Sequence, residues 1–175
     1  RHYDMMRSQL ALSDKFPFIY GRGPQQVAES FEMLCLGLGL SDQEFRQSPW
    51  SSTVVNTNSP RQIDRPMGQA LIDFARAGQL TIITPFCLSG AMAPVTVAGA
   101  LILQHAEALG ALVLTQLARP GAPVCIGGFG SNVDMKSGAP AFGTPSHVQM
   151  SIGTGQLCRH VGLPWRGAAG AASNT

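Results

Sequence analysis

The sequence predicts an α/β fold in which short parallel strands alternate with helices. Short, continuously apolar runs recur along the chain, as is typical of strands buried on both faces. Between them lie longer segments whose apolar residues recur at helical spacing. Glycine and proline mark most of the boundaries. Because strands and helices alternate, the sheet must be parallel, with crossover helices between its strands.

The predicted order is a helix, then repeated strand–helix units that end on a strand. The strands are 16–20, 52–57, 80–84, 123–127 and a last one that begins at 162 and includes Trp165 and Arg166. The later helices are 24–38, 66–77, 94–117 and 145–160. In the first of these, Val27, Phe31 and Leu34 recur at helical spacing. Pro24 suits its first turn, Gly39 its end, and Thr144 the cap of the last helix.

Two parallel architectures satisfy this order, an open doubly wound sheet and a TIM barrel. The dinucleotide-binding fingerprint of the open sheet is missing, because neither Gly21–Gly23 nor Gly127–Gly130 completes it. A barrel therefore fits better, although five strands do not close an eight-stranded barrel. We expect residues 1–175 to form a single partial TIM-barrel domain, the middle portion of a longer chain.

Composition narrows the function classes. The 175 residues are 45% hydrophobic and only 13% charged, so much of the surface is expected to face protein. The net charge is +2 and no basic stripe is present, which argues against nucleic acid as a partner. Gln104, His105 and Glu107 interrupt the most apolar stretch, 95–117. A buried soluble helix explains that stretch better than a membrane span.

The cysteines indicate a reducing compartment. Cys35, Cys87, Cys125 and Cys158 are widely and irregularly spaced, with no pairing typical of zinc sites. We expect buried free thiols, no bound metal and a cytoplasmic location.

Function in either architecture gathers at the carboxyl ends of the strands. These ends carry one carboxylate, Asp134, and no histidine, while His105, His147 and His160 lie in predicted helices, where packing or surface roles are expected. Neither a Gly-x-Ser-x-Gly motif nor paired carboxylates are present, so serine hydrolase and glycosidase chemistry are disfavoured. The remaining candidates are amides, aromatics and one arginine: Asn56, Asn58, Phe86, Phe129 and Arg166.

These candidates suggest a pocket for an organic cation. Aromatic faces such as those of Phe86 and Phe129 attract quaternary ammonium groups, although core packing is the more common role of such a ring taken singly. Arg166 suits a carboxylate held by two parallel bonds, with a structural salt bridge as the alternative. Asn56 and Asn58 are expected to orient the ligand.

At the same residues the chain resembles the trimethylamine methyltransferase family. The segments that carry the resemblance are NTNSP at 56–60, ARAGQ at 75–79, TPFCLSGAMAPVT at 84–96, AEAL at 106–109, RPGAP at 119–123, DMKSGAPAFGTP at 134–145 and GLPWRG at 162–167. The resemblance runs from about residue 56 to the C-terminus and is fainter before it.

The resemblance implies a TIM barrel and transfer of a methyl group from a methylated amine to the cobalt of a corrinoid on a separate protein. This chain would then bind no cofactor itself, and its partners would be the cognate corrinoid protein, a small methylated amine and further copies of the parent chain. One branch of the family uses pyrrolysine for tertiary amines, and other members include glycine betaine demethylases. No pyrrolysine occurs in these residues. The alternatives are a non-catalytic module that binds a betaine-like cation and a purely structural fragment.

Overall fold

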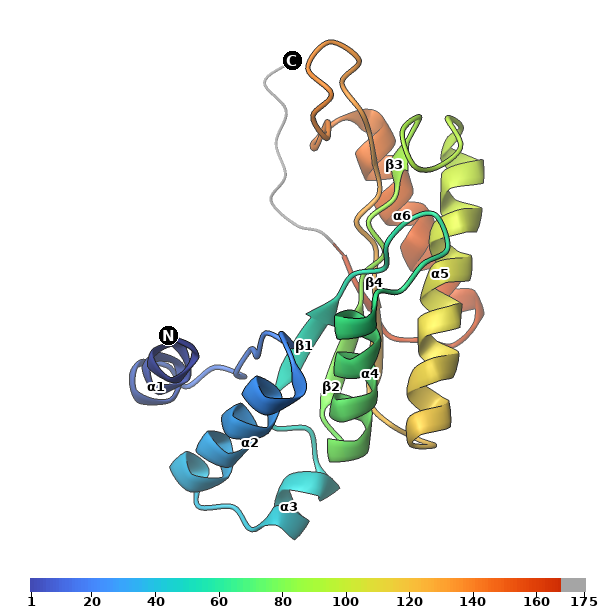
Figure 1. Cartoon of the computed structure of the whole chain (residues 1–175). Coiled ribbons are helices and arrows are strands. Elements are labelled where there is room, and N and C mark those ends of the chain that lie inside the picture. The colour runs from blue at the N-terminus through green and yellow to red at the C-terminus, as the bar shows by residue number, and fades with distance from the viewer. Residues whose placement is uncertain (168–175) are drawn as a thin grey trace. The chain divides into compact units, whose positions relative to one another are not determined.

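The computed structural model describes residues 1–167, and helices alternate with strands as the sequence predicts (Figure 1). The helices are α1 (His2–Leu12), α2 (Pro24–Leu38), α3 (Asp42–Gln47), α4 (Arg65–Ala77), α5 (Val97–Ala118) and α6 (Pro145–His160). The strands are β1 (Ser52–Val55), β2 (Leu80–Ile83), β3 (Leu88–Ser89), β4 (Val124–Gly127), β5 (Ser131–Asn132) and β6 (Trp165–Arg166).

The main sheet keeps its strands in chain order. β1, β2, β4 and β6 form a four-stranded sheet in that sequence, and β4 and β6 are parallel. A doubly wound sheet reverses its strand order at a switch point, whereas a barrel places successive strands side by side. The observed order is therefore compatible with a portion of a TIM barrel, the architecture that the sequence favours.

Several boundaries differ from the predicted ones. The expected strand at 16–20 reduces to a single parallel bridge between Phe18 and Ser52. The long helix begins three residues later than predicted, because the hydroxyl of Thr96 accepts a hydrogen bond from the Gly99 amide and caps it. α3 was not predicted, although Ser41 and Glu44 form a capping box at its start. β3 and β5, a short parallel pair, were also not predicted.

The described residues group into two compact units, which are treated separately below. Unit 1 comprises residues 1–55, 65–82 and 113–124. Unit 2 comprises residues 56–64, 83–112 and the described residues from 125 onward.

Unit 1 has a sealed apolar core. Val27 and Leu34 of α2 pack with Phe74 of α4 and Phe45 of α3, and each of these side chains is at most 2% exposed. The ring of Phe31 lies 5.2 Å from that of Phe45 and 5.0 Å from that of Phe74, measured between centroids. Burial of this kind contributes roughly 1.5–3 kcal/mol for each large side chain.

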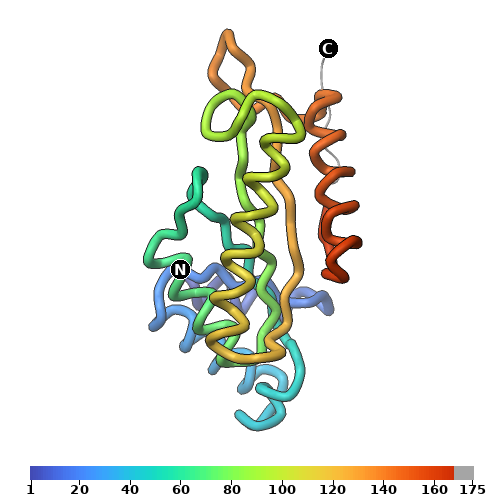
Figure 2. The backbone as a smooth tube through the Cα atoms, turned by 90° about the vertical axis from the view of Figure 1, so that its right-hand side faces the viewer, coloured from blue at the N-terminus to red at the C-terminus, as the bar shows by residue number. Residues whose placement is uncertain are grey.

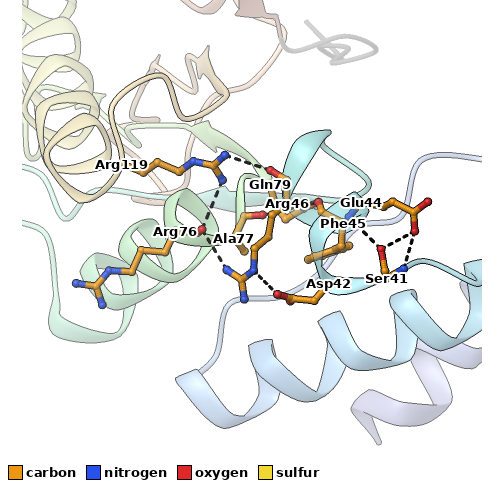
Figure 3. A network of polar contacts seen from close by, with 9 residues as sticks. All are labelled: Ser41, Asp42, Glu44, Phe45, Arg46, Arg76, Ala77, Gln79 and Arg119. Atoms are coloured by element: carbon orange, nitrogen blue, oxygen red, sulfur yellow. Dashed lines mark hydrogen bonds and ion pairs between the residues drawn. The ribbon is translucent and has the colours of Figure 1, made fainter.

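A polar network completes unit 1 beside this core (Figure 3). The buried amide of Gln79 accepts hydrogen bonds from the backbone N–H groups of Trp50 and Ser51, at 2.8 and 3.1 Å. It donates to the carbonyls of Phe45 and Ala77, at 2.8 and 3.0 Å. One side chain thus satisfies backbone groups just before β1, in α3 and at the end of α4, so its role is to hold the fold together.

Unit 2 packs helices against its strands. α6 contacts β5 and β6, and Figure 2 shows α6 as the red helix, with α5 running along the extended segments that follow β2 and β4. A Cβ at Gly153 of α6 would lie 2.5 Å from Leu101 of α5, so the two helices approach closely there. The side chain of Gln104 also donates to the hydroxyl of Thr154 at 2.6 Å.

α5 is apolar along most of its length. By length and composition alone it could cross a bilayer. Core helices of soluble proteins pass the same test, so this is weak evidence for a membrane span. The expectation of a buried helix holds for one face, where Gln104 and Glu107 are 2% and 6% exposed. The other face is more open than predicted, since Ile102 and Leu117 are exposed.

Candidate functional site

The candidate site in unit 2 lies where β4 and β6 end, on one face of the sheet. Ile126 pairs with Trp165 and Gly127 pairs with Arg166 in the parallel register. The ring of Trp165 packs against Gly155 of α6, at 3.1 Å from where a Cβ would be. Because successive residues of a strand point to opposite faces, Gly127 and Arg166 lie on the face away from α6.

Thr84, directly after β2, belongs to the same face. A Cβ at Gly127 would overlap the hydroxyl of Thr84, so these two residues share one side of the sheet. A side chain at position 127 would displace Thr84, which explains why glycine occupies this strand end. Thr84 is buried, and its Oγ1 has no hydrogen-bond partner among the described residues.

Three phenylalanines lie in the segments that follow β2 and β4. Phe86 and Phe129 stack with centroids 5.4 Å apart, and Phe142 lies 4.8 Å from Phe129. The neighbouring residue Gly130 faces α6, where a Cβ would meet Met150. All three rings are half-buried, so part of each remains available to a ligand. The structure therefore brings Phe86 and Phe129 together, as the sequence predicts, and adds Phe142.

His147 supports this cluster from α6. It is buried, its ring lies edge-on to Phe142 at 5.4 Å, and its Nδ1 is 2.9 Å from the carbonyl oxygen of Gly130. Because a carbonyl only accepts, Nδ1 carries the proton in this contact. The packing role expected for a helical histidine is thus observed.

The two asparagines are placed differently. The side-chain amide of Asn56 donates to the carbonyl of Thr84 at 2.9 Å, which joins Asn56 to the site. The side-chain oxygen of Asn58 instead accepts from the Asp64 amide at 3.2 Å, within its own loop. The backbone of Asn58 also exchanges two hydrogen bonds with Gln62. Asn58 therefore stabilises the loop that carries Asn56, and within residues 1–167 its side chain makes no hydrogen bond to the other four candidates.

Arg166 is exposed and makes no ion pair within residues 1–167. The structural salt bridge considered as its alternative role is not seen in that part of the chain. Burial raises the pKa of the Cys125 thiol, and the positive charge of Arg166 opposes that rise. The guanidinium thus remains free for an external anion on the same face as Thr84 and Gly127.

The thiols near the site are unsuited to nucleophilic work. All four cysteines are free, with Cys87 and Cys158 buried and Cys35 and Cys125 half-buried. Burial raises the pKa of Cys87 to about 11, so this thiol is protonated at neutral pH. Within residues 1–167 no three histidine, cysteine or acidic side chains gather in a way that could hold a metal.

The geometry is suited to binding a zwitterion. Half-buried aromatic rings can hold an organic cation, and an unpaired guanidinium can hold a carboxylate. Comparison with known proteins gives the family. A family model described as trimethylamine methyltransferase (MTTB) matches residues 1–175. The chain belongs to the trimethylamine methyltransferase family.

Named relatives within this family include enzymes for two amines. A glycine betaine methyltransferase from Desulfitobacterium hafniense is 32% identical over 97% of this chain and 35% of its own length. Trimethylamine methyltransferase MttB from the same species is 32% identical over 87% of the chain and 30% of its own length. MttB from Methanosarcina barkeri is 32% identical over 72% of the chain and 26% of its own length. The chain thus spans about a third of the length of these relatives, and the family resemblance predicted from the sequence is confirmed.

Proposed function

We propose that this chain is part of a methyltransferase that takes a methyl group from a methylated amine and passes it to the cobalt of a corrinoid on a partner protein. Membership of the methyltransferase family supports the reaction class. The single observation that carries the choice of amine is Arg166, which makes no ion pair within residues 1–167 and lies on the face of the sheet that also bears Thr84 and Gly127. It favours a carboxylated quaternary amine such as glycine betaine over trimethylamine.

The reaction needs little acid–base chemistry from the protein. A quaternary ammonium loses its methyl group with the electron pair of the broken C–N bond remaining on nitrogen, so the amine product leaves neutral. The corrinoid of the partner protein, when bound, would supply the nucleophile as reduced cobalt. The protein's contribution is then orientation and electrostatic stabilisation, which suits a site built from aromatics, amides and an arginine.

Each side chain has a place in this proposal. Phe86 and Phe129 would contact the trimethylammonium group, a type of contact worth about 2 kcal/mol or more when desolvated. Arg166 would hold the carboxylate by two parallel hydrogen bonds. Asn56, tied to Thr84, would orient the ligand between these two groups. Asn58 would act by closing the loop that carries Asn56.

The test is amine-dependent methylation of the cognate corrinoid protein by the intact parent polypeptide. The cobalt absorbance spectrum is followed with glycine betaine, trimethylamine and other methylated amines. We expect a signal with glycine betaine. A signal with trimethylamine alone would contradict the assigned amine and point to the pyrrolysine-using branch.

A non-catalytic binding module for a betaine-like cation is the alternative. It predicts that no amine methylates the corrinoid, whereas calorimetry still detects betaine binding. We also propose that the parent protein works in the cytoplasm as a homo-oligomer, without nucleic acid or membrane partners. Four free thiols are compatible with such a reducing compartment.

A further inference from the structure

Glu107 is a buried carboxylate that the proposed reaction does not use. It is the one charged side chain of α5, and it is 6% exposed. Removing a carboxylate from water is costly unless hydrogen bonds replace the lost hydration. The contacts of Glu107 therefore show what its placement achieves.

The donors to Glu107 come chiefly from one loop, residues 56–64, which follows β1. Oε1 accepts a hydrogen bond from the backbone N–H of Arg61 at 2.7 Å. Oε2 accepts from the hydroxyl of Thr57 at 2.5 Å and from the hydroxyl of Ser59 at 2.8 Å. Hydrogen bonds to an ionised acceptor are stronger than neutral ones, so one side chain holds the loop at three points.

These three hydrogen bonds to Glu107 set the position of Asn56. Thr57 is directed toward Glu107, while the preceding side chain, Asn56, reaches the carbonyl of Thr84. Arg61 has a positive φ of 57°, the only non-glycine residue with one in the described chain, and its N–H is held by Glu107. Such a backbone conformation is uncommon outside glycine and persists where surrounding contacts enforce it.

Gln104 shows that not every buried polar side chain of α5 binds loop 56–64. It lies one turn earlier on the same helix and is also buried, at 2% exposed. Its side chain donates to Thr154 of α6 rather than to the loop. The two side chains thus have similar burial and different partners, and of the two only Glu107 binds the loop that carries Asn56.

We propose that Glu107 is a positioning residue, which holds loop 56–64 so that Asn56 meets the substrate in a productive orientation. This inference rests on the proposed function, because it assumes that Asn56 orients a methylated amine. Glu107 itself touches neither substrate nor cobalt. Its loss should therefore impair catalysis through the loop while leaving the corrinoid protein's binding unchanged.

The experiment compares Glu107→Ala, Glu107→Gln and Gln104→Ala in the intact parent polypeptide. With glycine betaine and the cognate corrinoid protein, we expect Glu107→Ala to lower kcat about 10²-fold, the scale of a misplaced reactant. The KM for the corrinoid protein should not change. The kcat of Glu107→Gln should lie within about tenfold of the wild-type value, because an amide can accept a hydrogen bond from the Arg61 N–H and donate to the two hydroxyl oxygens. Hydrogen exchange should be faster at the Arg61 amide in the alanine variant.

Gln104→Ala is the matched control. It should lower the Tm, since it also removes a buried hydrogen bond, while leaving kcat and the exchange at Arg61 unchanged. If Glu107→Ala does not fold, the double variant Thr57→Val with Ser59→Ala removes two of the donors and should lower kcat in the same direction. A folded Glu107→Ala protein with wild-type kcat would overturn the inference. If the unmodified parent polypeptide fails to methylate the corrinoid with every amine tested, the proposed function is overturned, and the positioning role with it.

Discussion

Two phenylalanine clusters in this chain have the same size and different surroundings. In unit 1, Phe45 and Phe74 are 2% and 0% exposed, and only Phe31, which packs against both, is half-buried. In unit 2, the rings of Phe86, Phe129 and Phe142 stack at similar distances but remain half-buried. Ring stacking alone therefore does not mark a binding site. The candidate site is inferred instead from incomplete burial of the rings together with nearby polar groups that lack partners among the described residues.

The polar groups beside the clusters differ in the same way. In unit 1, Arg119 donates to the carbonyl of Arg46 at 3.1 Å, and Arg46 pairs with Asp42 at 2.9 Å (Figure 3). In unit 2, Arg166 has no ion pair within the described residues. Buried hydroxyls without a partner among the described residues occur in both units, at Thr53 and Thr81 in unit 1 and at Thr84 in unit 2, so the arginines carry the contrast. Groups whose hydrogen bonds are used within the fold stabilise it, and groups left open are available for a ligand.

The strongest test of this contrast is Gln79→Ala. The substitution leaves backbone groups of Trp50, Ser51, Phe45 and Ala77 without their partner. We expect a loss of about 3–4 kcal/mol in the free energy of unfolding, measured by urea titration of the intact protein. Gln43→Ala, at an exposed position of α3, is the control and should change it by less than about 0.5 kcal/mol. Equal effects of the two substitutions would refute the structural role of Gln79.

Arg166→Ala tests the candidate site in unit 2. We expect kcat/KM for glycine betaine to fall about 10²-fold, because a bidentate contact to the carboxylate is lost. Stability should stay within about 0.5 kcal/mol, since the side chain is exposed and makes no ion pair with the residues that the structure describes. Arg159→Ala, which removes an exposed charge from α6, should leave turnover unchanged. Wild-type turnover by Arg166→Ala would remove Arg166 from the site.

Matched substitutions in the two clusters should separate binding from stability. Phe129→Leu should weaken glycine betaine binding about tenfold in calorimetry, through loss of the cation–aromatic contact. Tert-butylacetate, the uncharged-carbon isostere of the ligand, should bind both proteins weakly. Phe74→Leu should instead lower stability by about 1.5 kcal/mol and leave binding intact. If Phe129→Leu binds glycine betaine normally, the ring is packing alone.

The smallest expected effect is at the capping box of α3. Ser41→Ala should cost about 1 kcal/mol of stability, because the hydroxyl no longer accepts from the Glu44 amide. Hydrogen bonds from the side chain and backbone of Ser41 lower the pKa of Glu44. A lowered pKa means that this contribution is present above the ordinary glutamate pKa and is lost as pH falls through the lowered value. The difference between wild type and variant in urea unfolding should therefore shrink in acid, and a constant difference would contradict the pairing.

Local signals in the sequence determined most of the helices. The proline and glycine that flank α2 set both of its ends as predicted, and Thr144 caps α6. These signals act over a few residues, so they survive in any tertiary context. The strand at 16–20 shows the limit, because its apolar run found only one bridging partner, at Ser52. Strand pairing depends on a distant segment that periodicity does not identify.

For the candidate site, the sequence by itself determined which residue types follow the strands, and the family resemblance added the chemistry. Only the tertiary structure decided which of them share a face. The register of β4 with β6 directs Arg166 away from α6, and the close approach of Thr84 places it over Gly127. The contact between Thr57 and Glu107 spans 50 residues. No local pattern encodes such a contact, because it forms only after the loop and α5 have packed together.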